Sequence, residues 1–190
     1  VPDIQVEPSS IPEGQRIQVQ DTLENASLTC SLPETQVSAG PEIVLWLMDR
    51  LAFTGAVAQG LGWGGYKLDE LPDGSVHMTD GKCLEAILEP LTSDPDKRVY
   101  RARGRYTTMR KSITITGEGV VAVKWRVRDD GTMVMWGRVW IKLDNGVLHR
   151  LGKTAAPLIS RTLTKKASKF IRIATRLCAC VSADPEALYR

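Results

Sequence analysis

Long hydrophobic runs are absent from this sequence. The longest purely apolar stretch is the six residues 43–48, whereas a helix that spans a bilayer needs about 20. We therefore expect no transmembrane helix. The chain of 190 residues is long enough to bury a hydrophobic core without disulfides or metals. Its ordinary apolar and charged fractions exclude a disordered or fibrous protein.

Nucleotide-binding motifs are also missing. The glycine-rich segment 60–65, GLGWGG, has no GK[ST] sequence, and its spacing is not that of GxGxxG before a helix. Because glycine permits backbone angles that other residues avoid, we interpret the segment as a tight turn or flexible gate that carries Trp63. We expect no cofactor.

The cysteines show no metal-binding spacing. There is no CxxC pair, and the two histidines do not form an HxxxH pattern. We interpret the cysteines as reduced, mostly buried thiols, which favours a cytoplasmic protein. The four are Cys30, Cys83, Cys178 and Cys180.

Acidic residues are scarce in the second half of the chain. Residues 1–97 contain 16 acidic and 5 basic side chains, and residues 98–190 contain 6 acidic and 20 basic ones. Between residues 146 and 183 there is no acid at all. This asymmetry favours a basic face for an anionic partner, unless the two halves pair their charges with one another.

The C-terminal region carries one long amphipathic pattern. Between residues 154 and 181 the apolar residues recur at steps of three and four, which predicts a single helix with one apolar stripe. At about 1.5 Å per residue this helix is roughly 40 Å long. It therefore needs a partner surface of similar length. The stripe consists of Ile159, Leu163, Ala167, Phe170, Ala174, Leu177 and Val181.

Two N-terminal segments precede the main run of strands. Residues 1–25 are interpreted as an extended leader, because their first part is rich in Pro, Ser and Glu. Residues 26–32 alternate between apolar and small polar side chains and predict the first strand. Pro41 then opens a predicted helix that runs to about residue 53 or 57.

Residues 66–107 predict an antiparallel meander. Short β patterns at 66–70, 76–79, 84–91 and 99–107 are separated by turn signals rich in Asp, Gly and Pro. In the last of them one face is predicted to point inward and the other to solvent. The inward face has Tyr100, Ala102, Gly104 and Tyr106, and the solvent face has Arg101, Arg103 and Arg105.

Residues 120–143 predict a hairpin around Asp129-Asp130-Gly131. With this three-residue loop, residues whose numbers sum to 260 lie opposite each other. A two-residue loop would place Arg128 opposite Met133, so polarity favours the longer loop. One face of the hairpin is then apolar and rich in Met and Trp. The other face is basic and also carries Trp136 and Trp140.

The order of these elements resembles the START and polyketide-cyclase-like superfamily, which has the helix-grip fold of Bet v 1-type proteins. The likeness rests on the strand 26–32 followed by a helix, the stretch LPDGSVHMTDGKCLEAILEPLTSDPDKRVYRARGRY, the hairpin VVAVKWRVRDDGTMVMWGRVWI and the terminal helix, and covers residues 26–181. It implies an α+β fold, in which a curved antiparallel sheet wraps around a long C-terminal helix. Residues 26–190 would form this domain.

The resemblance also implies a hydrophobic cavity between sheet and helix. The expected ligand is an apolar small molecule or lipid, held by a non-catalytic carrier or sensor. Flexible thioethers and aromatic rings suit such a cavity. The candidate lining residues are Tyr100, Tyr106, Trp125, Met133, Met135, Val139, Phe170 and Ala174.

A cyclase or aromatase that uses the same cavity is the alternative implied by the resemblance. His77 is the candidate general base, because the pKa of histidine lies near neutrality. The sequence nominates no second polar group to act with it, and a lone histidine in a strand is also compatible with a structural role.

The predicted C-terminal helix is strongly basic. One hypothesis is that it docks on an anionic membrane surface. Another is a nucleic-acid site, in which Trp136 and Trp140 stack on bases. A third is a solvated helix face that the acidic first half balances. The cations are Arg161, Lys165, Lys166, Lys169, Arg172 and Arg176.

Overall fold

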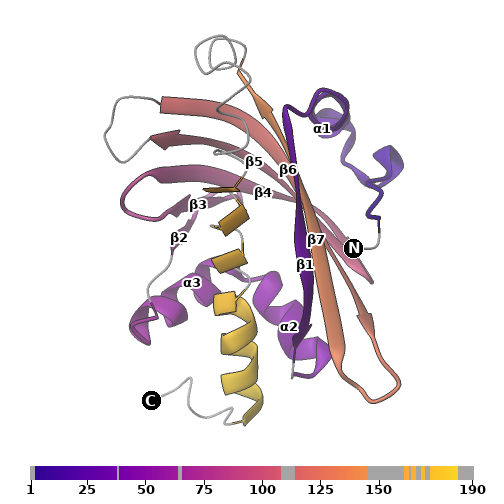
Figure 1. The fold of residues 1–190 in the computed structure, drawn as a ribbon, viewed down its shortest axis with the longest axis vertical. Helices are drawn as coiled ribbons and strands as arrows, with labels where there is room; N and C mark the ends of the chain where they lie inside the picture. The colour runs from indigo at the N-terminus through magenta and orange to yellow at the C-terminus, as the bar shows by residue number, and fades with distance from the viewer. Residues whose placement is uncertain are drawn as a thin grey trace.

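A curved, seven-stranded antiparallel sheet dominates the computed structural model (Figure 1), which describes residues 3–37, 39–63, 66–107, 114–144, 161–162, 164–165, 168–169 and 172–183. The strand order is β1-β7-β6-β5-β4-β3-β2, so the first strand closes one edge beside the last. The strands are β1 (Leu28–Val37), β2 (Lys67–Glu70), β3 (Val76–Thr79), β4 (Leu84–Asp94), β5 (Lys97–Thr107), β6 (Thr114–Val127) and β7 (Met133–Leu143).

The β6–β7 hairpin has the register predicted from polarity. Val121 lies opposite Val139 and Val127 opposite Met133, so the paired numbers sum to 260. In the turn, Gly131 has φ 78°, a conformation that glycine adopts without strain. The carboxylate of Asp130 accepts hydrogen bonds from the backbone amide and hydroxyl of Thr132, at 2.9 and 2.6 Å. The apolar face of the hairpin therefore points to the concave side of the sheet.

Two helices, and not one, follow β1. They are α2 (Pro41–Met48) and α3 (Leu51–Gly60), so the predicted single helix is wrong. The break lies at Asp49, whose carboxylate accepts two hydrogen bonds from Arg98 of β5, at 2.7 and 3.1 Å. The Tyr100 hydroxyl donates to the carbonyl of Met48, at 3.2 Å. These partners lie about fifty residues further along the chain, so the local sequence does not reveal the break.

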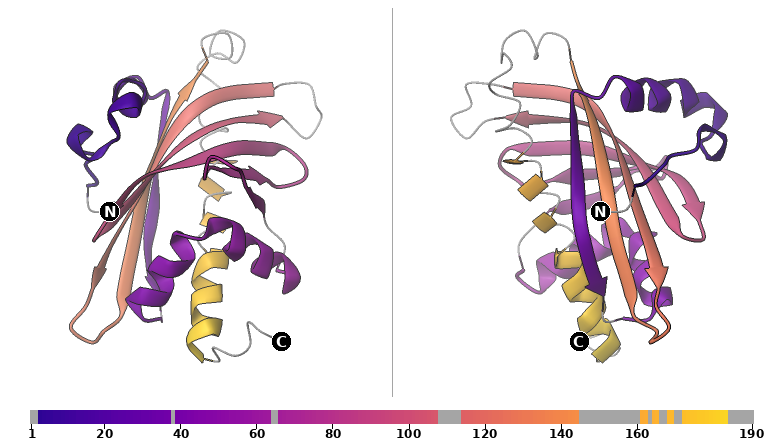
Figure 2. Two further views of the ribbon diagram at one scale, coloured as in Figure 1. Left: turned by 180° about the vertical axis from the view of Figure 1, so that it is seen from behind. Right: turned by 45° about the vertical axis from the view of Figure 1, so that its right-hand side comes forward.

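The N-terminal segment is helical for half of its length and packs against the sheet. A short 3-10 turn (η1, Pro8–Ser10) leads into α1 (Glu13–Glu24), so the expectation of an extended leader is wrong for these residues. α1 lies on the opposite side of the sheet from α2 and α3 (Figure 2). Ile4, Ile11 and Val19 are buried there in one cluster with Trp136. The convex face of the sheet therefore has a second hydrophobic core.

This N-terminal segment also covers residues that were expected to face solvent. Trp136 is only 6% exposed, and Trp140 packs against the same cluster. Arg101 is 7% exposed and bonds to Gln18 of α1 and Glu118 of β6, at 3.1 and 3.0 Å. The prediction of an exposed tryptophan is therefore wrong for Trp136, and Trp140 is half-buried. The prediction of solvent exposure is also wrong for Arg101.

The C-terminal helix packs into the concave side of the sheet. Residues 172–183 are helical, as are the described residues between 161 and 169. Leu177 and Val181 are buried in one cluster with Val44, Trp125 and Met133. The predicted α+β helix-grip architecture is thereby confirmed. No helix within the described residues is long and apolar enough to cross a membrane.

A cavity between sheet and helices

A cavity of about 290 Å³ lies between the concave face of the sheet and the helical layer. Strands β1 and β3 to β7 form one wall, and α2, α3 and the C-terminal helix form the other. The helices contribute Val44, Leu47, Met48, Leu51, Thr54, Ala174, Thr175 and Cys178. The cavity is therefore lined by elements from both halves of the chain.

Small residues in the middle of the sheet make room for this cavity. Ala86, Gly104 and Gly117 lie opposite one another across β4, β5 and β6. The adjacent row, which also lines the cavity, contains Ala102 and Gly119. A Cβ on Gly104 would lie 2.6 Å from the carbonyl oxygen of Glu85, so glycine is required for the close approach of β4. The small residues in these two rows are the feature of the sequence that indicates a cavity, and the large apolar side chains alone do not reveal it.

Five of the eight candidate lining residues meet at this cavity. They are Tyr100, Tyr106, Met135, Val139 and Ala174.

Trp125 and Met133 do not line the cavity, although they share a sheet face with Met135. Both lie near the hairpin turn, where Leu177 and Val181 of the C-terminal helix pack against them. Strand alternation gives the face of a residue but not whether a helix already covers it. Phe170 lies outside the described residues.

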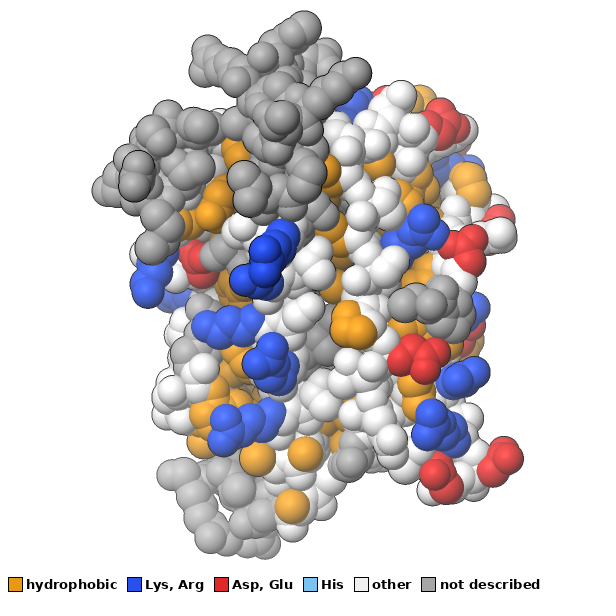
Figure 3. Space-filling model, viewed as in Figure 1, with side chains coloured by type: hydrophobic (Ala, Val, Ile, Leu, Met, Phe, Trp, Pro, Cys, Tyr) orange, Lys and Arg blue, Asp and Glu red, His pale blue; other side chains and the backbone are white. Residues whose placement is uncertain are grey.

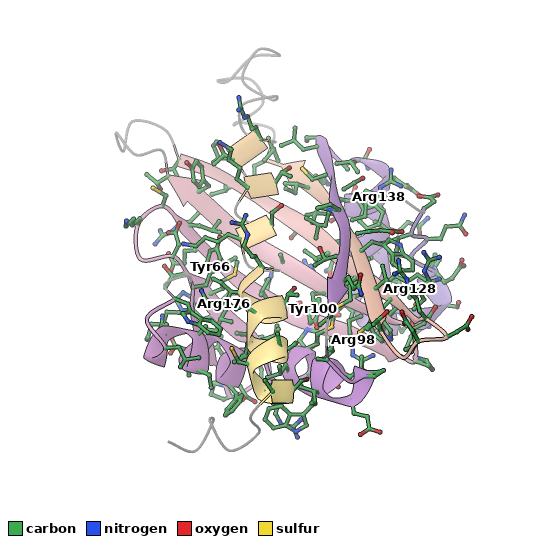
Figure 4. All side chains as sticks on the ribbon, turned by 60° about the horizontal axis from the view of Figure 1, so that its bottom comes forward. Tyr66, Arg98, Tyr100, Arg128, Arg138 and Arg176 are labelled. Atoms are coloured by element: carbon green, nitrogen blue, oxygen red, sulfur yellow. The ribbon has the colours of Figure 1, made fainter. Side chains whose placement is uncertain are left out.

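The hydroxyl groups near α2 are already occupied by protein partners. Tyr100 donates to the Met48 carbonyl at 3.2 Å, and Thr54 donates to the Leu47 carbonyl at 2.8 Å. Burial raises the pKa of Tyr100 above its ordinary value, and burial also raises the pKa of Tyr66 to about 12. Both phenols therefore remain neutral at physiological pH. Figure 4 shows Tyr66 and Tyr100 on either side of the C-terminal helix.

Solved structures share this arrangement, although no family model and no curated protein sequence matches the chain. A conserved protein from Geobacillus kaustophilus superposes with a TM-score of 0.58 and 12% identity, covering 81% of this chain and 97% of its own. Norcoclaurine synthase from Thalictrum flavum superposes with a TM-score of 0.53 and 14% identity, covering 80% of this chain and 94% of its own. Ara h 8.0201 superposes with a TM-score of 0.55 and 11% identity, covering 80% and 98%. The chain has the helix-grip fold of START and Bet v 1-type proteins.

Among the described residues that line the cavity, Cys178 is the one with a thiol group. It is 3% exposed, and burial raises its pKa to about 11. Because the thiolate is the nucleophilic form, the side chain is unreactive near neutral pH. Cys178 therefore acts as a small apolar residue of the wall.

His77 lies on the outer face of the helix-grip sheet, away from the cavity. Its neighbour Met78 lines the cavity, and alternate residues of a strand point to opposite faces. The Nε2 atom of His77 lies 3.0 Å from a carboxylate oxygen of Glu85. The hydrogen bond from His77, followed by the one from Arg105, lowers the pKa of Glu85. His77 is therefore part of a surface polar network and does not face a cavity ligand.

The cations predicted for an anionic surface lie on the C-terminal helix, and Figure 3 shows Lys and Arg side chains in a column over it. Lys166 lies outside the described residues. The other five are exposed: Arg161, Lys165, Lys169, Arg172 and Arg176.

Proposed function

We propose that this helix-grip protein binds an apolar small molecule or lipid in the cavity, as a carrier or sensor without covalent chemistry. The observation that carries the proposal is the apolar wall. Methionine, leucine, valine and isoleucine dominate the described lining, and the Tyr100 and Thr54 hydroxyls donate to backbone carbonyls. Such a wall selects ligands by shape and by hydrophobic burial.

The size and composition of the cavity fit this role. Ligand pockets commonly enclose about 300–1,000 Å³, and the volume of about 290 Å³ lies just below that range. Met48, Met78 and Met135 line it, and methionine side chains adapt to ligands of different shape. A compact, mainly hydrocarbon ligand is the class that suits these walls best.

A cyclase-type enzyme in the same cavity has less support. Acid–base catalysis needs polar groups within hydrogen-bond reach of the substrate. In the described walls, Tyr100 and Thr54 are engaged with the end of α2, and Cys178 is protonated at neutral pH. The carboxylate of Glu118 is paired with Arg101. The remaining polar side chains that line the cavity are mainly hydroxyls, those of Tyr66, Tyr106, Thr116 and Thr175. His77 lies on the opposite sheet face. The carrier or sensor function therefore comes first.

The test compares two alanines of the same helix. Ala174 lines the cavity, whereas Ala179 is exposed on the outer side. We expect Ala174→Leu to lower the affinity for the uncharged fluorophore 1-aminoanthracene at least tenfold, because the leucine side chain occupies ligand space. Ala179→Leu should bind it as the unmodified protein does. Equal binding by all three proteins in a fluorescence titration would refute the proposed site.

A further inference from the structure

The described residues of the C-terminal helix present a basic face. Its exposed cations Arg161, Lys165, Lys169, Arg172 and Arg176 are separated by steps of four, four, three and four residues. On a helix these steps place side chains on one face. Ala174, Leu177 and Val181 belong to the opposite face, which contacts the cavity and the core. The basic face therefore points away from the protein.

No acidic partner of these cations is found among the described residues. Within the part of the chain that the structure describes, none of the five forms an ion pair, and residues 146–183 contain no acid. Five exposed and uncompensated charges on one face create a positive potential that attracts anions. The hypothesis that the acidic first half balances this helix is not supported by the described contacts.

Exposed apolar side chains lie in the same helical layer. Trp63 is half-buried against the core cluster, and the Arg176 guanidinium stacks 4.4 Å from the centre of its ring. Leu61, two residues before Trp63, is 48% exposed. Trp46 and Phe53 of α2 and α3 are 42% and 38% exposed. Apolar and aromatic side chains beside a basic helix face are typical of surfaces that lie in a membrane interface.

The aromatic rings of this layer are poorly suited to base stacking. Arg50 covers Trp46 at 4.5 Å, and Phe53 meets the same ring edge to face at 5.0 Å. Trp63 carries Arg176 on its ring. Trp136, which was a candidate for base stacking, is buried under the N-terminal segment on the other side of the sheet. The geometry therefore favours a bilayer over a single-stranded nucleic acid, which needs open stacking platforms.

We propose that the basic face of the C-terminal helix, together with Leu61 and Trp63, docks on an anionic lipid bilayer. The cations lie close to the lipid phosphates and carboxylates, and the apolar side chains enter the boundary between headgroups and acyl chains. The same helix forms a wall of the cavity. Docking is nevertheless independent of the ligand, since the surface charges do not depend on whether the cavity is filled.

The first experiment is co-sedimentation of the full chain with lipid vesicles. The protein should bind vesicles that contain phosphatidylserine and should not bind pure phosphatidylcholine. Binding should fall steeply as salt is added, because exposed charges are screened. Absence of binding to phosphatidylserine vesicles at low salt would overturn the proposal. Tighter binding to a single-stranded RNA than to these vesicles at the same salt concentration would also overturn it.

Matched triple variants then locate the surface. Lys165→Gln, Lys169→Gln and Arg172→Gln together should weaken vesicle binding on the order of a hundredfold, because each cation near an anionic bilayer contributes about fivefold. The control combines Arg16→Gln, Lys82→Gln and Arg128→Gln, which remove the same charge from exposed positions outside the helical layer. The control should bind within about twofold of the unmodified protein, since its cations lie away from the bilayer. An equal loss in both triples would mean that only net charge matters and would refute the site.

Failure of this experiment is distinguishable from failure of the proposed ligand site. Vesicle binding is measured on the protein without added ligand, and 1-aminoanthracene binding is measured without vesicles. The helix triple changes only exposed side chains, so its unfolding midpoint should stay close to that of the unmodified protein. In the control, Arg16→Gln removes a hydrogen bond of 2.8 Å to the Ile11 carbonyl, so its unfolding midpoint is measured beside its vesicle binding.

Discussion

The two basic regions of this molecule are built differently. Seven cations on the convex face of β5, β6 and β7 each lie against a carboxylate, whereas five on the C-terminal helix have none within the described residues. Those of the sheet are Arg101, Arg103, Arg105, Lys124, Arg126, Arg138 and Lys142. Most of their partners come from the first 97 residues, as for Asp3 with Arg138 and Asp21 with Lys142.

This difference shows in which part of the structure the acidic residues of the first half pair with the basic residues of the second half. On the convex face the acidic first half and the basic second half do pair. That pairing accompanies a hydrophobic contact, because the N-terminal segment places Ile4, Ile11 and Val19 over Trp136. On the C-terminal helix no such pairing is found among the described residues, and we propose that its charge is available for a partner. Net charge alone therefore does not distinguish a structural basic face from a binding face.

Among the tests of this comparison, we expect the largest loss of stability from a substitution of Ile11. It is a 1% exposed residue of the N-terminal segment that packs against the sheet, so Ile11→Ala should lower the free energy of unfolding by about 3 kcal/mol through lost burial and a cavity. Ile17, which is 82% exposed, provides the control, and Ile17→Ala should change stability by less than about 0.5 kcal/mol. Chemical denaturation measures both. Equal stabilities would mean that the N-terminal segment does not form a core with the sheet.

A smaller loss is expected when a sheet cation loses its partner. Glu118→Ala removes the carboxylate that lies 3.0 Å from the buried Arg101, leaving Glu89 at 3.6 Å. Because the second carboxylate remains, we expect a loss of about 1–2 kcal/mol in the free energy of unfolding. Arg172→Gln on the C-terminal helix should change it by less than about 0.5 kcal/mol. If Arg172→Gln cost as much as Glu118→Ala, the distinction between paired and unpaired cations would fail.

The smallest effect concerns acid pH. The hydrogen bond from Lys142, and then the one from Asn25, lowers the pKa of Asp21 below 3.8. A carboxyl with a lowered folded-state pKa stabilises the fold above its ordinary pKa, and this contribution is lost as the pH falls through the folded-state value. Asp21→Asn should therefore make the loss of stability below pH 3.8 shallower. Unfolding midpoints measured across this range test it, and superimposable pH profiles would contradict it.

The hairpin and the C-terminal helix could be predicted because each obeys one periodicity. The β6–β7 register followed from keeping Arg128 away from Met133, and the buried positions Leu177 and Val181 followed from the helical stripe. In the helix one face meets the sheet, and in the hairpin the polarity of the residues beside the turn was enough to set the register. Their polarity patterns were therefore sufficient.

The N-terminal helix and the break between α2 and α3 were not predictable in this way. α1 buries only Val19 and Thr22, too few to show a helical period. Its partner surface combines Trp136 with paired arginines, a mixture that looks like a solvated face. The break depends on Asp49 and Arg98, which are 49 residues apart. The N-terminal helix and the break between α2 and α3 both depend on tertiary contacts, which outweigh the helix propensity of the local sequence.

The cavity shows a similar limit. The large residues Tyr100 and Met135 mark its walls, but its existence depends on the rows of Ala and Gly across β4, β5 and β6. A pattern of apolar side chains alone cannot distinguish a filled core from a space. The position of small residues on facing strands can, once the register is known.

The most direct test of the central claim is native mass spectrometry of the purified protein, with Ala174→Leu and Ala179→Leu beside it. We predict a bound apolar molecule that organic extraction removes, present in the unmodified protein and in Ala179→Leu and depleted in Ala174→Leu. The same occupancy in all three proteins would contradict the account. So would a protein that is empty as purified and takes up no 1-aminoanthracene after extraction.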